Sequence, residues 1–195
     1  MNFEKHDSRC NKCKSVIYKF LFEIFHELEF KYKSDKVSTQ LEDYKGTQAY
    51  KPLSRIYKAL QEINGHESFV NSKNLQRCDL FLPSKKIVIE TDEIQHFTYP
   101  RYIALKNYPK EFKTGYDITW YYSECNRIKS YDSDPIYRDE QRAWYDTLRD
   151  FLPILTGDVK RTVRIPLGFH AWCKLDPTIN KDNLIFRNYF NKLVK

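Results

Sequence analysis

Two short apolar runs joined by a turn are the feature that most limits what this chain can fold into. Residues 77–82 (Arg-Cys-Asp-Leu-Phe-Leu) and 87–92 (Ile-Val-Ile-Glu-Thr-Asp) are the strongest strand patterns in the sequence, and residues 83–86 (Pro-Ser-Lys-Lys) separate them. Such a pair predicts an antiparallel β-hairpin. A turn of two or four residues makes the pairing symmetric and places Asp79 directly opposite Glu90, whereas a turn of three residues would break this pairing.

The predicted hairpin gathers carboxylates on one face. Side chains alternate along a strand, so Glu90 and Asp92 share a face, and Asp79 joins them through the pairing. Like charges that face each other destabilise a hairpin. A divalent cation between them would offset this repulsion, and Mg²⁺ prefers oxygen ligands. We therefore expect Asp79, Glu90 and Asp92 to bind Mg²⁺ (or Mn²⁺); the alternative is an exposed sheet face with scattered acids.

The rest of the chain mixes helical and strand patterns. Apolar residues recur at helical spacing in several segments, and two more segments are typical of strands. The predicted helices are 14–32, 51–63 (begun by Pro52 and ended by Asn64-Gly65), 99–113 and 137–152 (stopped by Pro153); the predicted strands are 67–70 and 161–167; residues 33–50 are a predicted loop. This order predicts an α/β (α+β) fold with a mixed central sheet flanked by helices. We expect one domain over 1–195, with an N-terminal extension (1–13) and a basic C-terminal region (168–195).

Composition narrows the class of protein. The chain has 195 residues and 41% hydrophobic residues, which is enough to bury a core and excludes a disordered chain. Its apolar stretches are too short to cross a bilayer, and its first seven residues lack the apolar core of a secretory signal. We expect no membrane partner and a cytoplasmic location. Five cysteines, an odd number, argue against a disulfide framework.

Positive charge is concentrated near the C-terminus. The net charge is +7, and residues 158–195 hold eight basic and three acidic residues, so five of the seven surplus charges lie there. A basic surface attracts polyanions, above all nucleic acid. The alternative is a solvated tail that keeps the protein soluble, and charge alone does not separate the two interpretations.

The hairpin residues resemble the motif of the PD-(D/E)XK nuclease superfamily, which has the restriction-endonuclease-like fold. The segment Glu90-Thr91-Asp92-Glu93-Ile94-Gln95-His96 is similar to the Vsr-like branch, in which an E-x-D strand leads into a Gln or His. The motif covers residues 77–96, and the resemblance at the level of the fold covers about 14–167. Two features depart from it: Asp92 stands where the family usually has lysine, and Cys78, not proline, precedes Asp79.

The resemblance implies metal-dependent hydrolysis of DNA phosphodiester bonds, in restriction, repair or defence against foreign DNA. A metal in such a site polarises a phosphoryl oxygen and lowers the pKa of its bound water. The implied catalytic residues are Asp79, Glu90, Asp92, Gln95 and His96, of which the first three bind the metal. Gln95 or His96 would replace the missing lysine, although His96 could instead be a structural residue at the strand end.

The resemblance also implies an acid from the first helix and a nucleic-acid partner. Glu27, rather than Glu23, is the better candidate for that acid. The implied partner is double-stranded DNA, and a homodimer is left open. The missing lysine favours an alternative, a non-catalytic nucleic-acid-binding module with a decayed nuclease site. A small-molecule enzyme is disfavoured because the sequence has no phosphate-binding glycine loop.

Arginines form a stripe on the predicted helix 137–152. Arg138, Arg142, Tyr145 and Arg149 share one side at helical spacing. Such a row suits a phosphate backbone, but nearby aspartates make ion pairs on a solvated helix equally natural. We favour ion pairs for the middle of the helix and keep Arg138 as a nucleic-acid contact. Two arginines of the last predicted strand, Arg161 and Arg164, are further predicted contacts.

Cys10 and Cys13 have the spacing of half a zinc site. A structural zinc needs four ligands, and no second pair follows in the sequence. His6, Cys78, Cys125 or Cys173 would have to complete the set through the fold. A redox site is less favoured because no strand precedes the pair. The sequence therefore favours two free thiols at a frayed terminus over structural Zn²⁺.

Overall fold

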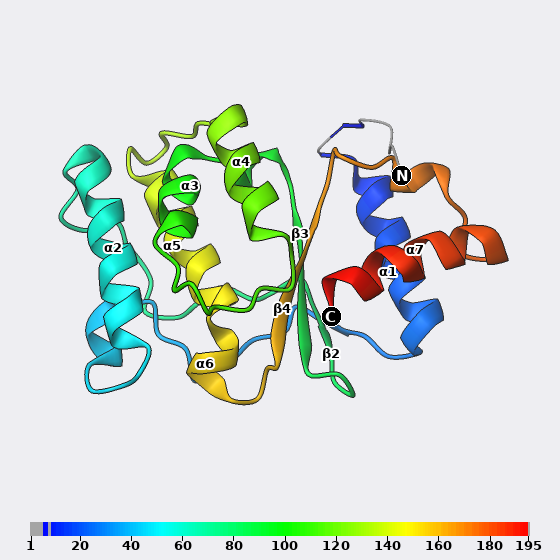
Figure 1. Cartoon of the computed structure of the whole chain (residues 1–195), viewed down its shortest axis with the longest axis horizontal. Coiled ribbons are helices and arrows are strands. Elements are labelled where there is room, and N and C mark those ends of the chain that lie inside the picture. The colour runs from blue at the N-terminus through cyan, green and yellow to red at the C-terminus, as the bar shows by residue number, and fades with distance from the viewer. Residues whose placement is uncertain (1–5, 8, 195) are drawn as a thin grey trace.

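A four-stranded mixed sheet crosses the middle of the molecule (Figure 1). The computed structural model describes residues 6, 7 and 9–194. The strands are β1 (Glu29–Phe30), β2 (Leu80–Leu82), β3 (Ile87–Asp92) and β4 (Arg161–Pro166), adjacent in that order. β2 is antiparallel to β1 and β3, while β4 runs parallel to β3. The predicted fold class, α/β (α+β) with a mixed sheet flanked by helices, is confirmed.

The hairpin has the predicted register. Leu80 pairs with Ile89 and Leu82 with Ile87 across a turn of four residues, 83–86. Continued by one position, this register sets Asp79 against Glu90, and the Asp79 N–H donates to Glu90 Oε1 at 3.3 Å. β3 is buried along its whole length because β2 and β4 flank its edges and helices cover both of its faces.

Five helices cover one face of the sheet and enclose the larger core. They are α2 (Tyr50–Asn64), α3 (Tyr99–Lys106), α4 (Ile118–Ile128), α5 (Arg138–Asp150) and α6 (Leu152–Thr156). Val88 from β3 packs in this core with Trp144 and Phe151. The indole N–H of Trp144 donates to the carbonyl of Thr39 at 2.8 Å, so this fully buried ring is also hydrogen-bonded.

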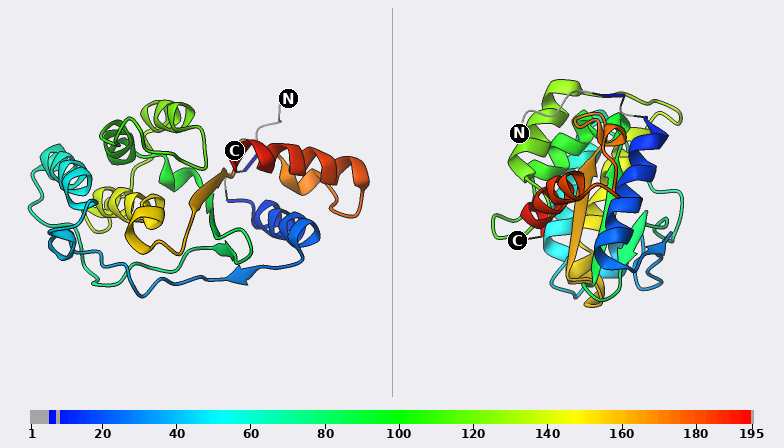
Figure 2. Two further views of the ribbon diagram at one scale, coloured as in Figure 1. Left: turned by 60° about the horizontal axis from the view of Figure 1, so that its bottom comes forward. Right: turned by 90° about the vertical axis from the view of Figure 1, so that its right-hand side faces the viewer.

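A second core lies on the opposite face. It is covered by α1 (Asn11–Phe25), α7 (Asn180–Leu193) and the short 3₁₀ helix η3 (Trp172–Lys174), and Figure 2 shows α1 and α7 together on that side. Ile89 of β3 points into this core because side chains alternate along the strand. Phe20 stacks on Phe186 with ring centroids 4.8 Å apart, which joins α1 to α7.

Helix boundaries follow local chemistry. The predicted helices 51–63 and 137–152 are confirmed as α2 and α5, and Gly65 ends α2 in the left-handed conformation with φ 72°. Pro153 does not end the helical region; it lies in the first turn of α6, where a missing N–H costs little. The first helix ends at Phe25, not residue 32, because His26 turns left-handed and the chain continues into β1.

Other elements differ from the sequence prediction. Residues 67–70 form no strand, and α3 ends at Lys106 rather than 113. α4 and α7 were not predicted; α7 lies in the predicted basic C-terminal region. Two further 3₁₀ helices are η1 (Leu41–Tyr44) and η2 (Ile94–His96).

The predicted N-terminal extension is described only in part. Residues 1–5 and 8 lie outside the described residues. α1 begins at Asn11, so Cys13 belongs to a helix and is fully buried, which contradicts a frayed terminus. Among the described residues, no helix combines the length and apolar character needed to cross a membrane.

Candidate functional site

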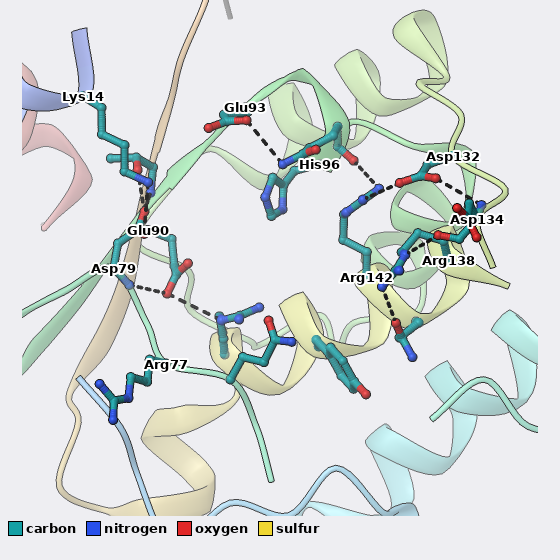
Figure 3. A pocket seen from close by; sticks show the side chains of 16 residues that line it. Lys14, Arg77, Asp79, Glu90, Glu93, His96, Asp132, Asp134, Arg138 and Arg142 are labelled. Carbon is teal, nitrogen blue, oxygen red and sulfur yellow. Dashed lines mark hydrogen bonds and ion pairs between the residues drawn. The ribbon is translucent and has the colours of Figure 1, made fainter. Parts of the chain in front are cut away.

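A pocket of about 570 Å³ opens beside the hairpin at the end where β3 terminates. In Figure 3, Lys14, Asp79 and Glu90 lie at one end of it. Asp132, Arg138 and Arg142 lie at the other end, with His96 between the two groups. The pocket therefore joins α1, the hairpin and α5, which are distant in sequence.

Asp79 lies just before β2 and is held by three groups. Lys14 of α1 approaches its Oδ1 at 3.1 Å. The backbone N–H of Thr91 donates to Oδ2 at 3.0 Å, and the Thr91 hydroxyl donates to the same oxygen. A carboxylate can accept about four hydrogen bonds. In the part of the chain that the structure describes, these contacts leave Asp79 with about one free acceptor position, and they turn its carboxylate towards Lys14 of α1.

Glu90 is the other hairpin carboxylate in the pocket, and it faces α5. Its Oε1 lies 3.6 Å from Nε of Arg149. Burial raises the pKa of Glu90 to about 7, and the nearby charge of Arg149 only partly opposes that rise. Glu90 is thus a carboxyl group that exchanges its proton near neutral pH.

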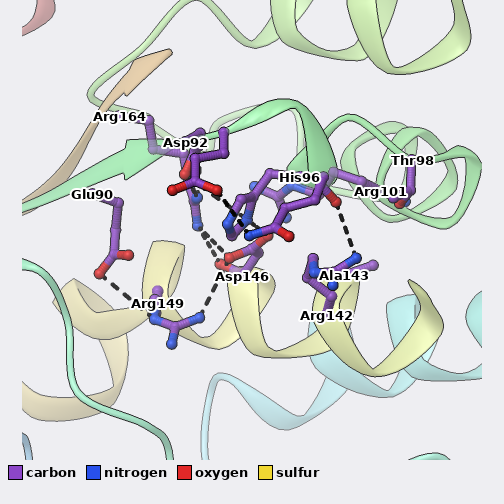
Figure 4. Close-up of polar contacts among 12 residues, drawn as sticks. Glu90, Asp92, His96, Thr98, Arg101, Arg142, Ala143, Asp146, Arg149 and Arg164 are labelled. Carbon is purple, nitrogen blue, oxygen red and sulfur yellow. Dashed lines mark hydrogen bonds and ion pairs between the residues drawn. The ribbon is translucent and has the colours of Figure 1, made fainter. Parts of the chain in front are cut away.

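Asp92 lies on the face predicted for it, but it does not line the pocket. Its two oxygens accept hydrogen bonds from Nη1 of Arg164 at 2.8 and 3.0 Å (Figure 4). Among the described residues, the one group of three or more His, Cys, Asp or Glu side chains with converging ligand atoms does not include Asp92. The prediction that three carboxylates converge is therefore wrong. Asp92 pairs with Arg164, and of the two carboxylates that line the pocket, Asp79 is turned towards Lys14 and Thr91 while Glu90 is turned towards Arg149.

Arg164 is fully buried, so the prediction that it contacts nucleic acid is wrong. Besides Asp92, its guanidinium donates to Asp150 at 2.7 Å and to the carbonyl of Asp146 at 3.0 Å. Burial would lower the pKa of Arg164, but Asp150 and Asp92 raise it well above its ordinary value. Arg164 is a permanent cation that neutralises buried aspartates.

His96 and Gln95 both line the pocket. His96 Nδ1 lies 2.8 Å from Asp146 Oδ2 and 4.0 Å from Asp92 Oδ1 (Figure 4). Burial would lower the pKa of His96, but these two acids raise it above the ordinary value. The imidazole is therefore easier to protonate than an ordinary histidine, which favours a hydrogen-bond donor over a neutral base. Gln95 donates to Glu93 at 3.3 Å.

The arginine stripe of α5 forms the far wall of the pocket, and most of it is ion-paired. Arg142 contacts Asp132 and Asp139, each at 3.0 Å, as favoured for the middle of the helix. Arg138 donates to the carbonyl of Asp134 at 2.9 Å and makes no ion pair among the described residues. Arg138 thus stays the better placed of the two for a ligand.

Two predicted site residues lie elsewhere. Glu27 accepts hydrogen bonds from Ser84 in the hairpin turn, at the opposite end of β3 from the pocket, so it does not supply the helix acid. Arg161 pairs with Ile87 at that same end and donates to the carbonyl of Leu193 at 3.5 Å. Parallel pairing of β4 with β3 fixes this separation, and Arg161 does not line the pocket.

Two cations in the pocket were not singled out from the sequence. Lys14 occupies the side of the pocket where a helix acid was expected, and Arg77 is an exposed residue at its edge. Lys14 follows a buried cysteine on α1, and Arg77 directly precedes the hairpin. Their positions depend on how α1 packs against the sheet, for which helical spacing alone gives no signal.

Charges of both signs line the pocket in equal number. There are five Lys or Arg residues and five Asp or Glu residues, besides His96: Lys14, Arg77, Arg138, Arg142 and Arg149; Asp79, Glu90, Glu93, Asp132 and Asp134. Such a lining accommodates a cation and an anion together. Comparison of the chain with protein-family models, with curated proteins and with solved structures finds no match.

Proposed function

We propose that this pocket is the active site of a metal-dependent nuclease that hydrolyses phosphodiester bonds of double-stranded DNA. The observation that carries the proposal is the placement of Asp79 against Glu90 in a pocket whose far wall is the arginine face of α5. The proposal includes a restriction-endonuclease-like core, which the mixed sheet between two helical layers supports.

The chemistry of the donor set fits a magnesium or manganese ion. Glu90 offers a carboxylate whose burial makes its charge costly, so a bound cation would stabilise the ionised form. Asp79 lines the same pocket and offers a second carboxylate. Two carboxylates plus water and substrate oxygens are a usual ligand set for Mg²⁺.

Cations in the pocket fit a phosphate group. Nε of Arg149 is buried and has no hydrogen-bond partner within residues 6, 7 and 9–194, although it lies only 3.6 Å from Glu90. A buried unsatisfied donor is costly, and a phosphate oxygen would satisfy it. Lys14 is charged at neutral pH: burial would lower its pKa, but Asp79 raises it. Arg149 and Lys14 therefore both attract a phosphate.

In the proposed reaction, the protein's own groups bind, orient and exchange protons. Arg149 and Lys14 would hold the scissile phosphate, and Asp79 and Glu90 would hold the metal. When bound, the metal would supply charge stabilisation at the phosphoryl oxygen and a more acidic water. His96, held by Asp146, donates a hydrogen bond from its remaining N–H.

The test is cleavage of plasmid DNA by the purified chain with Mg²⁺ or Mn²⁺. Glu90→Gln and Asp79→Asn should each lower the rate by at least about 100-fold, because even groups that only orient metal ligands change activity by about 10- to 100-fold. Glu62→Gln, an exposed position on α2, is the matched control and should cleave like the wild type. Equal rates in all four proteins, or in the presence of chelator, would refute the proposal.

One observation favours a second function, a nucleic-acid-binding module without catalysis. Lys14 already contacts Asp79, Arg149 lies 3.6 Å from Glu90, and Arg164 already neutralises Asp92, so all three predicted metal ligands have cationic partners within the protein. This module would bind DNA equally well with and without Mg²⁺ and would cleave none. DNA binding measured by fluorescence anisotropy beside the cleavage assay separates the two functions.

A further inference from the structure

Four potential metal ligands converge outside the pocket. They are His6, Cys10, Cys13 and Cys173, and their ligand atoms all lie within 4.8 Å of one another. Two of these residues precede or cap α1, one lies in its first turn, and Cys173 lies in η3, after β4. The fold therefore completes the half-site that the sequence shows at Cys10 and Cys13.

Backbone hydrogen bonds hold the sulfurs in this arrangement. Cys10 caps α1, and its Sγ accepts the N–H of Cys13 at 3.4 Å. Sγ of Cys13 accepts the N–H of Cys173 at 3.3 Å. N–H groups that point at sulfur stabilise the thiolate form, which is the form that binds metal.

The imidazole completes the cluster from the N-terminal side. His6 Nε2 lies 3.2 Å from Cys173 Sγ. The backbone N–H of His6 donates to the carbonyl of Gly168 at 2.9 Å, which ties this segment to the loop after β4. All the cysteines involved are free of disulfides.

The donor set and its spacing match tetrahedral zinc. Three thiolates and one imidazole are a standard ligand set for a structural zinc site. Sulfurs bound at about 2.3 Å in a tetrahedron lie about 3.8 Å apart, which is compatible with ligand atoms that all fall within 4.8 Å. Soft sulfur ligands select against Mg²⁺ and Mn²⁺, so this site is chemically distinct from the pocket.

We infer that His6, Cys10, Cys13 and Cys173 bind one structural Zn²⁺ ion. The ion joins the N-terminal segment and the first turn of α1 to η3, and the three thiols release their protons to solvent when it binds. Lys14 follows Cys13 directly, so the site also fixes the helix turn from which Lys14 reaches Asp79.

The test is metal analysis of the full chain, purified under reducing conditions without chelator. Mass spectrometry of the metal content should find about one zinc per chain. After exchange with Co²⁺, the protein should show sulfur-to-cobalt charge-transfer absorption and the intense visible bands of tetrahedral cobalt. Chelator should lower the melting temperature. None of these readouts depends on nuclease activity.

Substitutions distinguish a specific zinc site from adventitious metal binding. Cys173→Ser should lose the stoichiometric metal, while Cys125→Ser, a buried free cysteine in the other core, should keep it. If Cys173→Ser does not fold, His6→Cys provides the answer, because a fourth thiolate should retain cobalt and strengthen its charge-transfer band. Reduced wild-type protein that holds no zinc and gives no tetrahedral cobalt spectrum overturns the inference, as does a disulfide between any two of these cysteines.

Discussion

At the scale of single residues, the pocket owes its properties to a balanced set of buried charges. Arg101, Arg149 and Arg164 are permanent cations, and Asp92, Asp146 and Asp150 accompany them beneath the pocket. The three charges of each sign cancel. Glu90 and His96 are two further titratable groups that line the pocket, and both have shifted pKa values.

The sequence indicated the register of the hairpin but could not assign each acid its partner. Strand alternation correctly placed Glu90 and Asp92 on one face of β3. The side chain that neutralises Asp92, however, belongs to Arg164, on a strand that joins the sheet 72 residues later. Since that pairing comes from the parallel neighbour, the hairpin pattern carries no information about it.

Glu90→Gln should change how stability depends on pH. The pKa of Glu90 is about 7 in the folded chain, against about 4.3 when unfolded. Between these values only the folded state holds the proton, so ionisation of Glu90 costs stability as pH rises. Without metal, the variant should gain about 2–4 kcal/mol relative to wild type between pH 4 and pH 8. Urea unfolding at several pH values measures this, and parallel curves for the two proteins would contradict it.

Lys14→Gln should tighten metal binding while slowing cleavage. Lys14 is a cation 3.1 Å from Asp79 Oδ1, where it competes electrostatically with a metal ion. Its removal should lower the Kd for Mn²⁺ about tenfold, but the scissile phosphate would lose a partner. Titration calorimetry with Mn²⁺ measures the affinity. Lys19→Gln, exposed on the same helix, is the control; weaker Mn²⁺ binding by Lys14→Gln alone would mean that Lys14 supports the metal instead.

At the scale of helices and strands, the sequence predicted elements whose pattern is local. Alternation and a four-residue turn were enough for the hairpin, and apolar spacing with a terminal glycine was enough for α2. α4 and α7 were missed, and α4 carries much polar sequence between its few buried positions, Tyr121 and Cys125. β1 has only two residues and depends on its pairing with β2, so no local pattern indicates it.

Arg164→Met should show that β4 and α5 are joined through buried charge. The substitution leaves Asp92, Asp146 and Asp150 without their shared cation, and removal of one partner from a buried pair costs about 3–5 kcal/mol. Arg161→Met changes the same residue type on the same strand at a partly exposed position and should cost less than about 1 kcal/mol. Chemical denaturation gives both free energies of unfolding; similar losses for the two variants would argue against this role of the buried network.

At the scale of the whole molecule, the sheet separates two surfaces. The pocket lies at one end of the sheet and is lined by α5 from one layer and by Lys14 of α1 from the other. α7, with much of the C-terminal positive charge, packs beside α1 and contributes no residue to the pocket (Figure 1). Lys181 and Lys192 are exposed on α7. The surplus positive charge near the C-terminus therefore does not belong to the lining of the pocket. DNA bound in the pocket and DNA bound on α7 would contact different cations.

The salt dependence of DNA binding should identify which layer holds the DNA. If the pocket binds the phosphates, Arg77→Gln combined with Arg138→Gln removes two contacts and should reduce the slope of log K against log salt by about two, since each contact with a duplex contributes about 0.9. Lys181→Gln combined with Lys192→Gln removes the same charge from α7 and should leave the slope unchanged. Anisotropy titrations of a labelled duplex at several salt concentrations measure both. If only the α7 variant lowers the slope, the DNA binds on α7. A phosphodiester bond in contact with Lys181 and Lys192 lies across the sheet from Glu90, so the proposed active site would then be refuted.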